Sequence, residues 1–242
     1  MGNLWKGFKE HRTFRFTSLL VILLIALVVL APVIAPYNPL EAVMKDANQA
    51  PSMAHLFGTD KLGRDVLSRI LYGGAYSLSS VLALVAIIFC VGTFLGLVAG
   101  YFGGLIDTVI MRIADMMISF PGVILAIAIA GIMGGSLVNA MIALTAVTWT
   151  KYARLSRSMV LKIRKRDFVD AAIVSGGTSS HILWTHIMPN VVPILVITAV
   201  SDIGAMMMEL AGLSFLGFGG QPPAPEWGLM LNEGRQQLQT AP

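Results

Sequence analysis

Charged residues are scarce in this sequence, and cysteine is almost absent. Only 12% of the 242 residues are Asp, Glu, Lys or Arg, whereas soluble domains carry about 25%. Hydrophobic residues make up 56% and the mean hydropathy is +0.76, which excludes an ordinary soluble domain and a disordered chain. The single cysteine, Cys90, lies inside an apolar run. The chain therefore cannot build an internal disulfide framework or a zinc site made of cysteines.

Long uncharged runs take the place of the missing charges. A helix of about 20 apolar residues crosses the hydrocarbon core, and backbone groups in lipid must bond within the helix. The runs without Asp, Glu, Lys or Arg cover residues 16–40, 70–106, 116–150 and 171–201. We therefore predict an all-α integral membrane protein with about five spans, at 16–35, 76–100, 106–133 (kinked at Pro121), 137–157 and 190–211.

The positions of the basic residues predict the orientation of these spans. Four Lys or Arg lie within residues 1–15 and seven within 151–166, whereas residues 36–75 carry four residues of each sign. Short loops rich in Lys and Arg stay in the cytoplasm, and four spans place both basic clusters on that side. We predict a cytoplasmic N-terminal segment at 1–15, an N-terminal membrane helix at 16–35, an extracytoplasmic loop at 36–75, and a core at 76–242 with a cytoplasmic loop at 158–189.

Several alternatives follow from the same residues. The first run also has the basic start of a cleaved signal peptide, although it is longer than usual and no small-x-small site follows it. A stand-alone secondary transporter or channel is a second class, but such proteins often contain repeats, and none is visible here. The basic clusters flank apolar runs, so we expect no nucleic-acid partner. No nucleophile–base pair or metal-ligand set occurs in the runs, which argues against an enzyme.

The cytoplasmic loop has the composition of a compact helical knob. We predict a short helix from about Asp167 to Ser175, a glycine turn at 176–177, and a second helix stopped by Pro189. Small Ala171 and Ala172 leave a face that the groove of a partner could approach closely. From these residues alone, an amphipathic connector lying on the inner leaflet explains the segment equally well.

This loop resembles the EAA loop in permease subunits of type I ABC importers. The acid-Ala-Ala, Gly and Pro positions of that loop correspond to Asp170, Ala171, Ala172, Gly176 and Pro189, with Asp in place of the usual Glu. His-Ile-Met-Pro-Asn at 186–190 resembles the form found in the dipeptide, oligopeptide and nickel branch. Three further signatures of that branch have counterparts at 57–65, 112–121 and 213–228. The resemblance covers about residues 57 to 240.

The resemblance implies a type I permease helix bundle that forms half of a translocation pathway in a bacterial or archaeal inner membrane. Its partners would be a second permease, two cytoplasmic ATPases that hold ATP and Mg²⁺, and an extracytoplasmic substrate-binding protein. This chain lacks a Gly-x-x-x-x-Gly-Lys-Ser/Thr loop, so we expect no cofactor, no metal and no ATP hydrolysis on it. Resembling permeases carry one more span after residue 228. We therefore expect a sixth helix to be missing and the C-terminus to lie outside.

Two further groups of residues are candidates for function. Asp202 and Glu209 are seven residues apart, on one face of a helix, with three Met residues between them. Acids at membrane depth are costly and often mark substrate paths. We therefore predict a path that favours nickel or a metal chelate over di- or oligopeptides, with a hydrogen bond to the second permease as the alternative.

The second group lies in the extracytoplasmic loop and comprises Asp60, Gly63, Arg64 and Asp65. Charged residues around a glycine turn can order a loop for contact with the second permease or the binding protein. An ordinary solvated loop would carry the same residue types, so the sequence leaves these two interpretations open.

Overall fold

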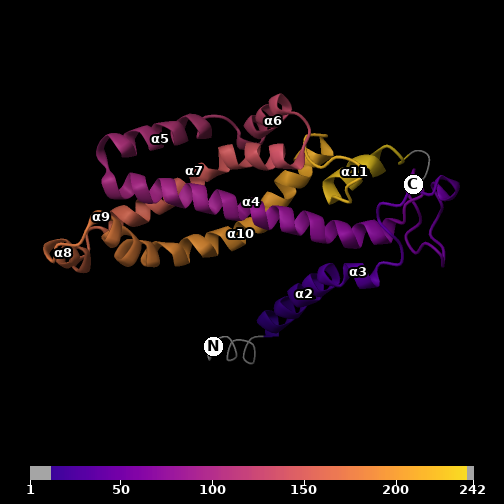
Figure 1. Cartoon of the computed structure of the whole chain (residues 1–242), viewed down its shortest axis with the longest axis horizontal. Coiled ribbons are helices and arrows are strands. Elements are labelled where there is room, and N and C mark those ends of the chain that lie inside the picture. Colours follow the sequence, from indigo (N-terminus) through magenta and orange to yellow (C-terminus); the bar gives the residue numbers. More distant parts are fainter. Residues whose placement is uncertain (1–11, 239–242) are drawn as a thin grey trace. The chain divides into compact units, whose positions relative to one another are not determined.

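The computed structural model describes residues 12–238, and within this range all regular elements are helices, which confirms the all-α class (Figure 1). The chain divides into two compact units, Met1–Leu78 with Pro222–Pro242 (the terminal unit) and Ser79–Gln221 (the central unit). The helices are α2 Arg12–Val29, α3 Ala31–Ile34, α4 Val66–Phe102, α5 Gly104–Ile118, α6 Gly122–Met133, α7 Leu137–Ile163, α8 Asp167–Val174, α9 Ser179–His181, α10 Met188–Phe215 and α11 Trp227–Arg235, with a 3-10 turn at Met44–Asp46 and a π-helical turn at Ile182–Ile187.

Among residues 12–238, three helical stretches are long and apolar enough to cross a membrane: α2, α4 and the continuous helix Ser179–Phe215. They contain or overlap the spans predicted at 16–35, 76–100 and 190–211. The bent pair α5 and α6 counts as a fourth span if it crosses as one. Helix α7 includes Lys151, Arg154 and Arg157 and is not among these stretches, so its crossing at 137–157 stays a prediction.

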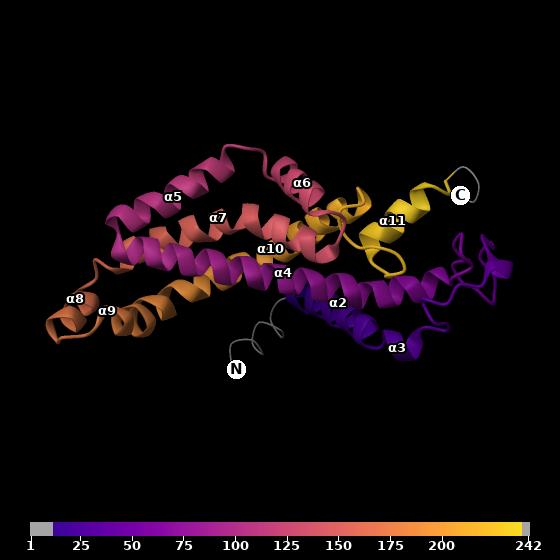
Figure 2. The ribbon, with the colours of Figure 1, turned by 45° about the horizontal axis from the view of Figure 1, so that its top comes forward.

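The prediction of one kinked helix over 106–133 is wrong. The structure has two helices, α5 and α6, whose axes differ by 93° across the break at residues 119–121 (Figure 2). Pro121 has no N–H to continue α5 and keeps the residue before it out of the helical conformation. The proline therefore starts a new helix in a new direction, and its effect is larger than a kink.

The prediction that Pro189 stops a helix is also wrong. Pro189 lies in the first turn of α10, and helical structure continues from Ser179 to Phe215. The π-helical turn at Ile182–Ile187 immediately precedes α10. Such a turn changes the hydrogen-bond register, which lets the chain pass a residue without an N–H while it stays helical.

Helix α4 packs against α7 along a row of glycines within the central unit. A Cβ atom at Gly92 would lie 2.5 Å from the Trp149 carbonyl oxygen, and one at Gly96 would lie 2.3 Å from the Ala153 carbonyl oxygen. Gly100 faces Val160 in the same way, at 2.8 Å. Only residues without a side chain allow the two backbones to approach so closely. We call Gly92, Gly96 and Gly100 the glycine seam.

Candidate coupling segment, path acids and loop network

The predicted coupling segment forms one structure at one end of the central unit. Helix α8 begins at Asp167 and has Asp167 and Asp170 in its first turn, where their negative charge is favourable. Gly176 follows the helix with φ of +81°, the left-handed conformation predicted for a glycine at the end of a helix. Of the five predicted coupling residues, Asp170, Ala171, Gly176 and Pro189 are exposed and Ala172 is half-buried.

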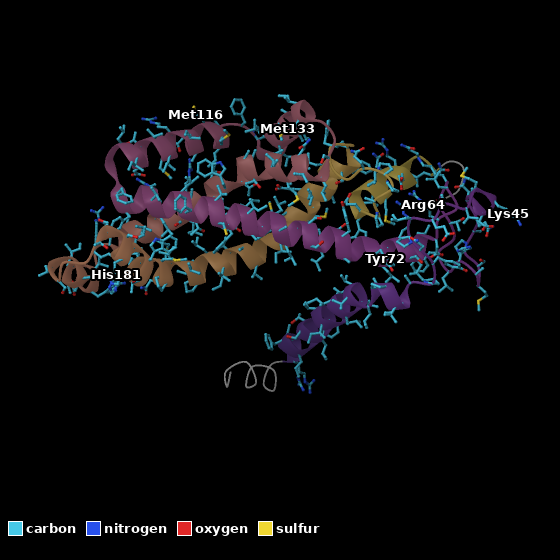
Figure 3. The ribbon with its side chains drawn as sticks, in the orientation of Figure 1. Lys45, Arg64, Tyr72, Met116, Met133 and His181 are labelled. Carbon is cyan, nitrogen blue, oxygen red and sulfur yellow. The ribbon has the colours of Figure 1, made fainter. Side chains whose placement is uncertain are left out.

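Buried side chains attach this segment to the apolar core of the central unit. Val169 of α8 and Ile182 and Ile187 of the π-helical turn are at most 1% exposed, and they belong to the same apolar core as residues of α7 and α10. The turn after α8 is closed by backbone bonds from Gly176 N–H to Ile173 O and from Gly177 N–H to Ala172 O, both 3.0 Å. The segment is thus a fixed helical knob. Figure 3 labels His181 at this end of the unit.

The knob also presents apolar side chains on its surface. Phe168 is 45% exposed, Ile173 50% and Val174 88%. An apolar patch beside two carboxylates suits contact with another protein.

The two histidines of this segment lie close together. The rings of His181 and His186 lie 5.7 Å apart in a T-shaped arrangement. Among residues 12–238 no group of three or more His, Cys, Asp and Glu side chains could hold a metal ion.

The two acids of α10 have different surroundings. Lys151 Nζ of α7 donates to both carboxylate oxygens of Asp202 at 2.7 Å, and Tyr152 Oη donates to Asp202 at 2.9 Å. Asp202 therefore makes an interhelical contact inside this chain. Glu209 has no hydrogen bond or ion pair with another described residue, and it lines a cavity of about 370 Å³ between α6, α7 and α10. Both acids were predicted to share one role, and the contact with Lys151 could not be predicted because it lies 51 residues away along the chain.

The basic residues of α7 and the turn after it fall into two groups. Arg154 is paired with Asp115, and Arg157 with Asp107, where Nη2 lies 2.5 Å from Oδ2. Lys162, Lys165 and Arg166 form no ion pair with a described carboxylate, and Arg164 instead donates to the Tyr101 carbonyl oxygen at 2.7 Å. The cations without an acid partner are those next to the coupling segment.

In the terminal unit, two acids and two arginines from residues 60–69 and α11 form an ionic network around the two buried arginines. Figure 3 labels one of them, Arg64. Asp60 accepts from Arg64 Nε at 2.7 Å and is also paired with Arg69. Glu233 of α11 accepts from Arg64 Nη2 at 3.0 Å and from Arg69 Nη1 at 2.8 Å. Arg64 and Arg69 are 1% and 2% exposed. We call Asp60, Arg64, Arg69 and Glu233 the loop network.

Burial by itself would raise the pKa of the Asp60 carboxyl. The backbone N–H groups of Arg64 and Leu62, which donate to Asp60, and the Arg64 guanidinium outweigh that effect, so the pKa of Asp60 lies below its ordinary value of 3.8. Asp60 is therefore held in its charged form. Sequence reasoning missed Arg69 and Glu233 because Glu233 is 164 residues away from Arg69 along the chain.

The other predicted loop residues are also turned into the protein. Asp65, 2% exposed, accepts from the Ser68 hydroxyl at 2.7 Å, and its other oxygen lies 3.0 Å from His55 Nδ1. Gly63 has φ of +73°, and a Cβ there would lie 1.8 Å from the Val43 carbonyl oxygen. The interpretation of this region as a solvated loop is therefore wrong, because these residues order the loop from inside.

The Pro-Glu-Trp-Gly stretch at 225–228 attaches α11 to the start of α4 within the terminal unit. Glu226 caps α11 by accepting from the N–H groups of Gly228 and Leu229 at 2.9 and 2.8 Å. Trp227 Nε1 donates to the Ile70 carbonyl oxygen at 3.0 Å. Gly73 makes room for this contact, since a Cβ there would lie 2.4 Å from the Pro225 carbonyl oxygen. These residues therefore have structural roles.

Two regions of the chain match families of known proteins. Residues 92–241 match the family described as the inner membrane component of binding-protein-dependent transport systems, and residues 1–51 match the N-terminal transmembrane domain of oligopeptide transport permease C.

Individual relatives agree with these matches. The chain is 39% identical to a dipeptide transport system permease protein of Alkalihalophilus pseudofirmus, over 98% of this chain and 78% of that protein. It is 40% identical to a glutathione transport system permease protein of Pectobacterium atrosepticum, over 98% and 79%. Identity to the nickel transport system permease protein of Escherichia coli is 39%, over 93% and 82%. The chain therefore belongs to the family of multi-pass inner-membrane permeases of ABC importers.

Proposed function

We propose that this permease forms one half of a translocation pathway and is driven by ATPases that dock on residues 167–189. The other components would be a second permease, two cytoplasmic ATPase subunits and an extracytoplasmic substrate-binding protein. In this arrangement the N-terminus and the coupling segment lie in the cytoplasm and residues 36–75 lie outside, as the Lys and Arg distribution favours. ATP and Mg²⁺ bind the ATPases, and this chain contributes no catalytic residue.

The observation that carries this proposal is one continuous helix that begins within the coupling segment and carries both acids of α10. The helix Ser179–Phe215 contains Asp202 and Glu209, and its first residues belong to the anchored knob. Helix α8 contacts the π-helical turn near the start of this helix. Because a helix transmits displacement along its axis, a push on α8 can be passed through that contact to the level of Glu209. This connection supports mechanical coupling that needs no chemistry on the permease itself.

The substrate is proposed from the two acids and from the relatives. The printed names of the relatives refer to dipeptide, glutathione and nickel transport. Binding of a bare nickel ion requires several ligands with suitable geometry, whereas Lys151 and Tyr152 already occupy Asp202. We therefore propose an organic cargo, a peptide or a metal chelate, in place of the bare ion.

The proposal is tested by reconstitution of the complete transporter and measurement of ATP hydrolysis stimulated by the loaded binding protein. We expect Gly176→Val and Asp170→Lys to remove most of the stimulation and leave membrane insertion intact. A side chain with a Cβ at φ of +81° costs about 1–2 kcal/mol, which displaces the end of α8. Asp170→Lys reverses the charge at the start of the docking helix.

Gly134→Val is the matched control. Gly134 also has a positive φ, +87°, and has open space around it, but it lies between α6 and α7. It should strain the chain at least as much, because φ of 87° with ψ of 160° is a conformation that essentially only glycine adopts, and it should preserve the stimulation. In a Cys90→Ser background, Ala171→Cys should crosslink to an ATPase subunit. If both coupling variants keep full stimulation and the thiol at 171 never crosslinks, the assignment of the coupling segment is wrong.

A further inference from the structure

Within α10, only one of the two acids has its charge balanced by the protein. Asp202 has a cation, Lys151, at 2.7 Å and a hydroxyl donor, Tyr152, at 2.9 Å. Glu209 has neither among the described residues, although the same helix carries both acids. An uncompensated carboxylate among apolar helices is costly, and such groups usually face a polar path or a partner.

The surroundings of Glu209 form a pocket of the size and composition of a small-ligand site. The cavity measures about 370 Å³ and is lined by Val123 and Ile127 of α6, Leu144 of α7 and Leu213 of α10, with Glu209 as its only charged residue. Small-molecule pockets start at about 300 Å³ and combine apolar walls with a few polar groups. One carboxylate in an apolar wall recognises a group that is both cationic and attached to an apolar body.

We propose that Glu209 binds the ammonium group of the transported molecule as it passes this permease. This inference deepens the proposed function and rests on it, because it names the chemical class of the cargo: a primary amine with apolar substituents, such as the amino end of a peptide. A hydrated divalent ion is not matched by this pocket, because it needs several oxygen, nitrogen or sulfur ligands and the side chains of the lining offer one carboxylate and the Met208 thioether. Asp202 takes no part in recognition, since Lys151 balances its charge.

The test measures the local preference for cations and does not depend on ATP-driven import. In the permease–ATPase complex with Cys90→Ser, Met208→Cys places a thiol in the cavity lining, at a residue that is 75% exposed. The rates of modification by a cationic aminoethyl methanethiosulfonate and an anionic sulfonatoethyl methanethiosulfonate are then compared. We expect the cationic reagent to be favoured by at least about tenfold, as for charge-steered encounters.

Two variants and two probes separate the proposal from its rivals. Glu209→Gln should abolish the preference. The matched control Asp202→Asn with Lys151→Gln, which removes the compensated ion pair as a unit, should preserve it. Glycinamide, which carries an ammonium group, should slow the modification, and N-acetylglycinamide should not. Equal rates for both reagents, protection by NiCl₂ but not by glycinamide, or a thiol that reacts with neither reagent because the second permease covers it would each overturn the proposal.

A transport measurement completes the test and distinguishes its failure from that of the proposed function. We expect Glu209→Gln to lower uptake of the cargo while ATP hydrolysis stimulated by the binding protein persists. If Glu209→Gln transports normally while Gly176→Val is inactive, the coupling function stands and the role of Glu209 is refuted. If Gly176→Val is also fully active, the proposed function itself fails.

Discussion

The two units of this permease hold their helices together by opposite means. In the terminal unit, four charged side chains of the loop network tie residues 60–69 to α11, and both arginines are almost fully buried. In the central unit, the glycine seam of α4 lies directly on the backbone of α7. The loop network depends on the balance of opposite charges, and the glycine seam depends on the absence of side chains. Different substitutions should therefore disrupt the two contacts.

The difference follows from the environment of each contact, which sets the free-energy cost of bringing its groups together. Inside lipid there is little hydrophobic gain when helices meet, so close backbone packing of small residues holds them together. A loop between helices has no long apolar face, and charged groups there can be buried only when each has a partner. The comparison therefore predicts which substitutions each unit tolerates.

The largest effect is expected from Arg69→Met. The change leaves the carboxylates of Asp60 and Glu233 with one arginine between them, and removal of one partner from a buried ionic group costs about 3–5 kcal/mol. Limited proteolysis of the purified permease should show faster cleavage between residues 36 and 75 than in the unaltered protein. Arg69→Lys, which keeps the charge, is the control and should be cut at an intermediate rate. Unchanged cleavage of Arg69→Met would show that the network does not hold the loop.

A smaller effect is expected from Gly96→Ala in the glycine seam. The added methyl group would lie 2.3 Å from the Ala153 carbonyl oxygen, so α4 and α7 must move apart, at a cost of about 1–3 kcal/mol. The measurement is the thermal unfolding midpoint in detergent. Protection of the loop at 36–75 should stay as it is, because the seam belongs to the central unit. A midpoint equal to that of the unaltered protein would contradict the close packing.

Acid should weaken the terminal unit and spare the seam. The pKa of Asp60 is lowered in the folded protein from 3.8, so its stabilising contribution is complete above that value and is lost as the pH falls through the lowered pKa. Pepsin digestion at decreasing pH should therefore reach the loop at 36–75 before it reaches α7. In Asp60→Asn this part of the pH dependence should disappear, and if it does not, another group is responsible.

The smallest effect, and the only stabilising one, is expected from Gly204→Ala. Gly204 lies inside α10, and a Cβ there would meet nothing within 4 Å. Alanine is favoured over glycine in a helix by about 0.5–1 kcal/mol, so the unfolding midpoint of the isolated chain should rise slightly. A fall in the unfolding midpoint comparable to that of Gly96→Ala would show that replacing a glycine destabilises this protein whether or not the added Cβ meets other atoms.

Local chemistry in the sequence was enough to predict several features of this protein. The long uncharged runs predicted apolar helices, because burial of backbone groups in lipid depends only on a continuous stretch of about 20 residues. The acid-Ala-Ala spacing and Gly176 predicted α8 and its left-handed end, which the structure confirms. The glycine seam also has a local signal, since glycines four residues apart, at 92, 96 and 100, allow close helix packing.

Tertiary structure alone decided which charges are compensated and where helices turn. Lys151 and Asp202 are 51 residues apart and Arg64 and Glu233 are 169 apart, so no local pattern distinguishes the balanced Asp202 from the unbalanced Glu209. Likewise, Pro121 separates two helices by 93° whereas Pro189 lies within a continuous helix. Proline removes an N–H in both places, and the surrounding hydrogen bonds and packing determine whether the chain bends or continues.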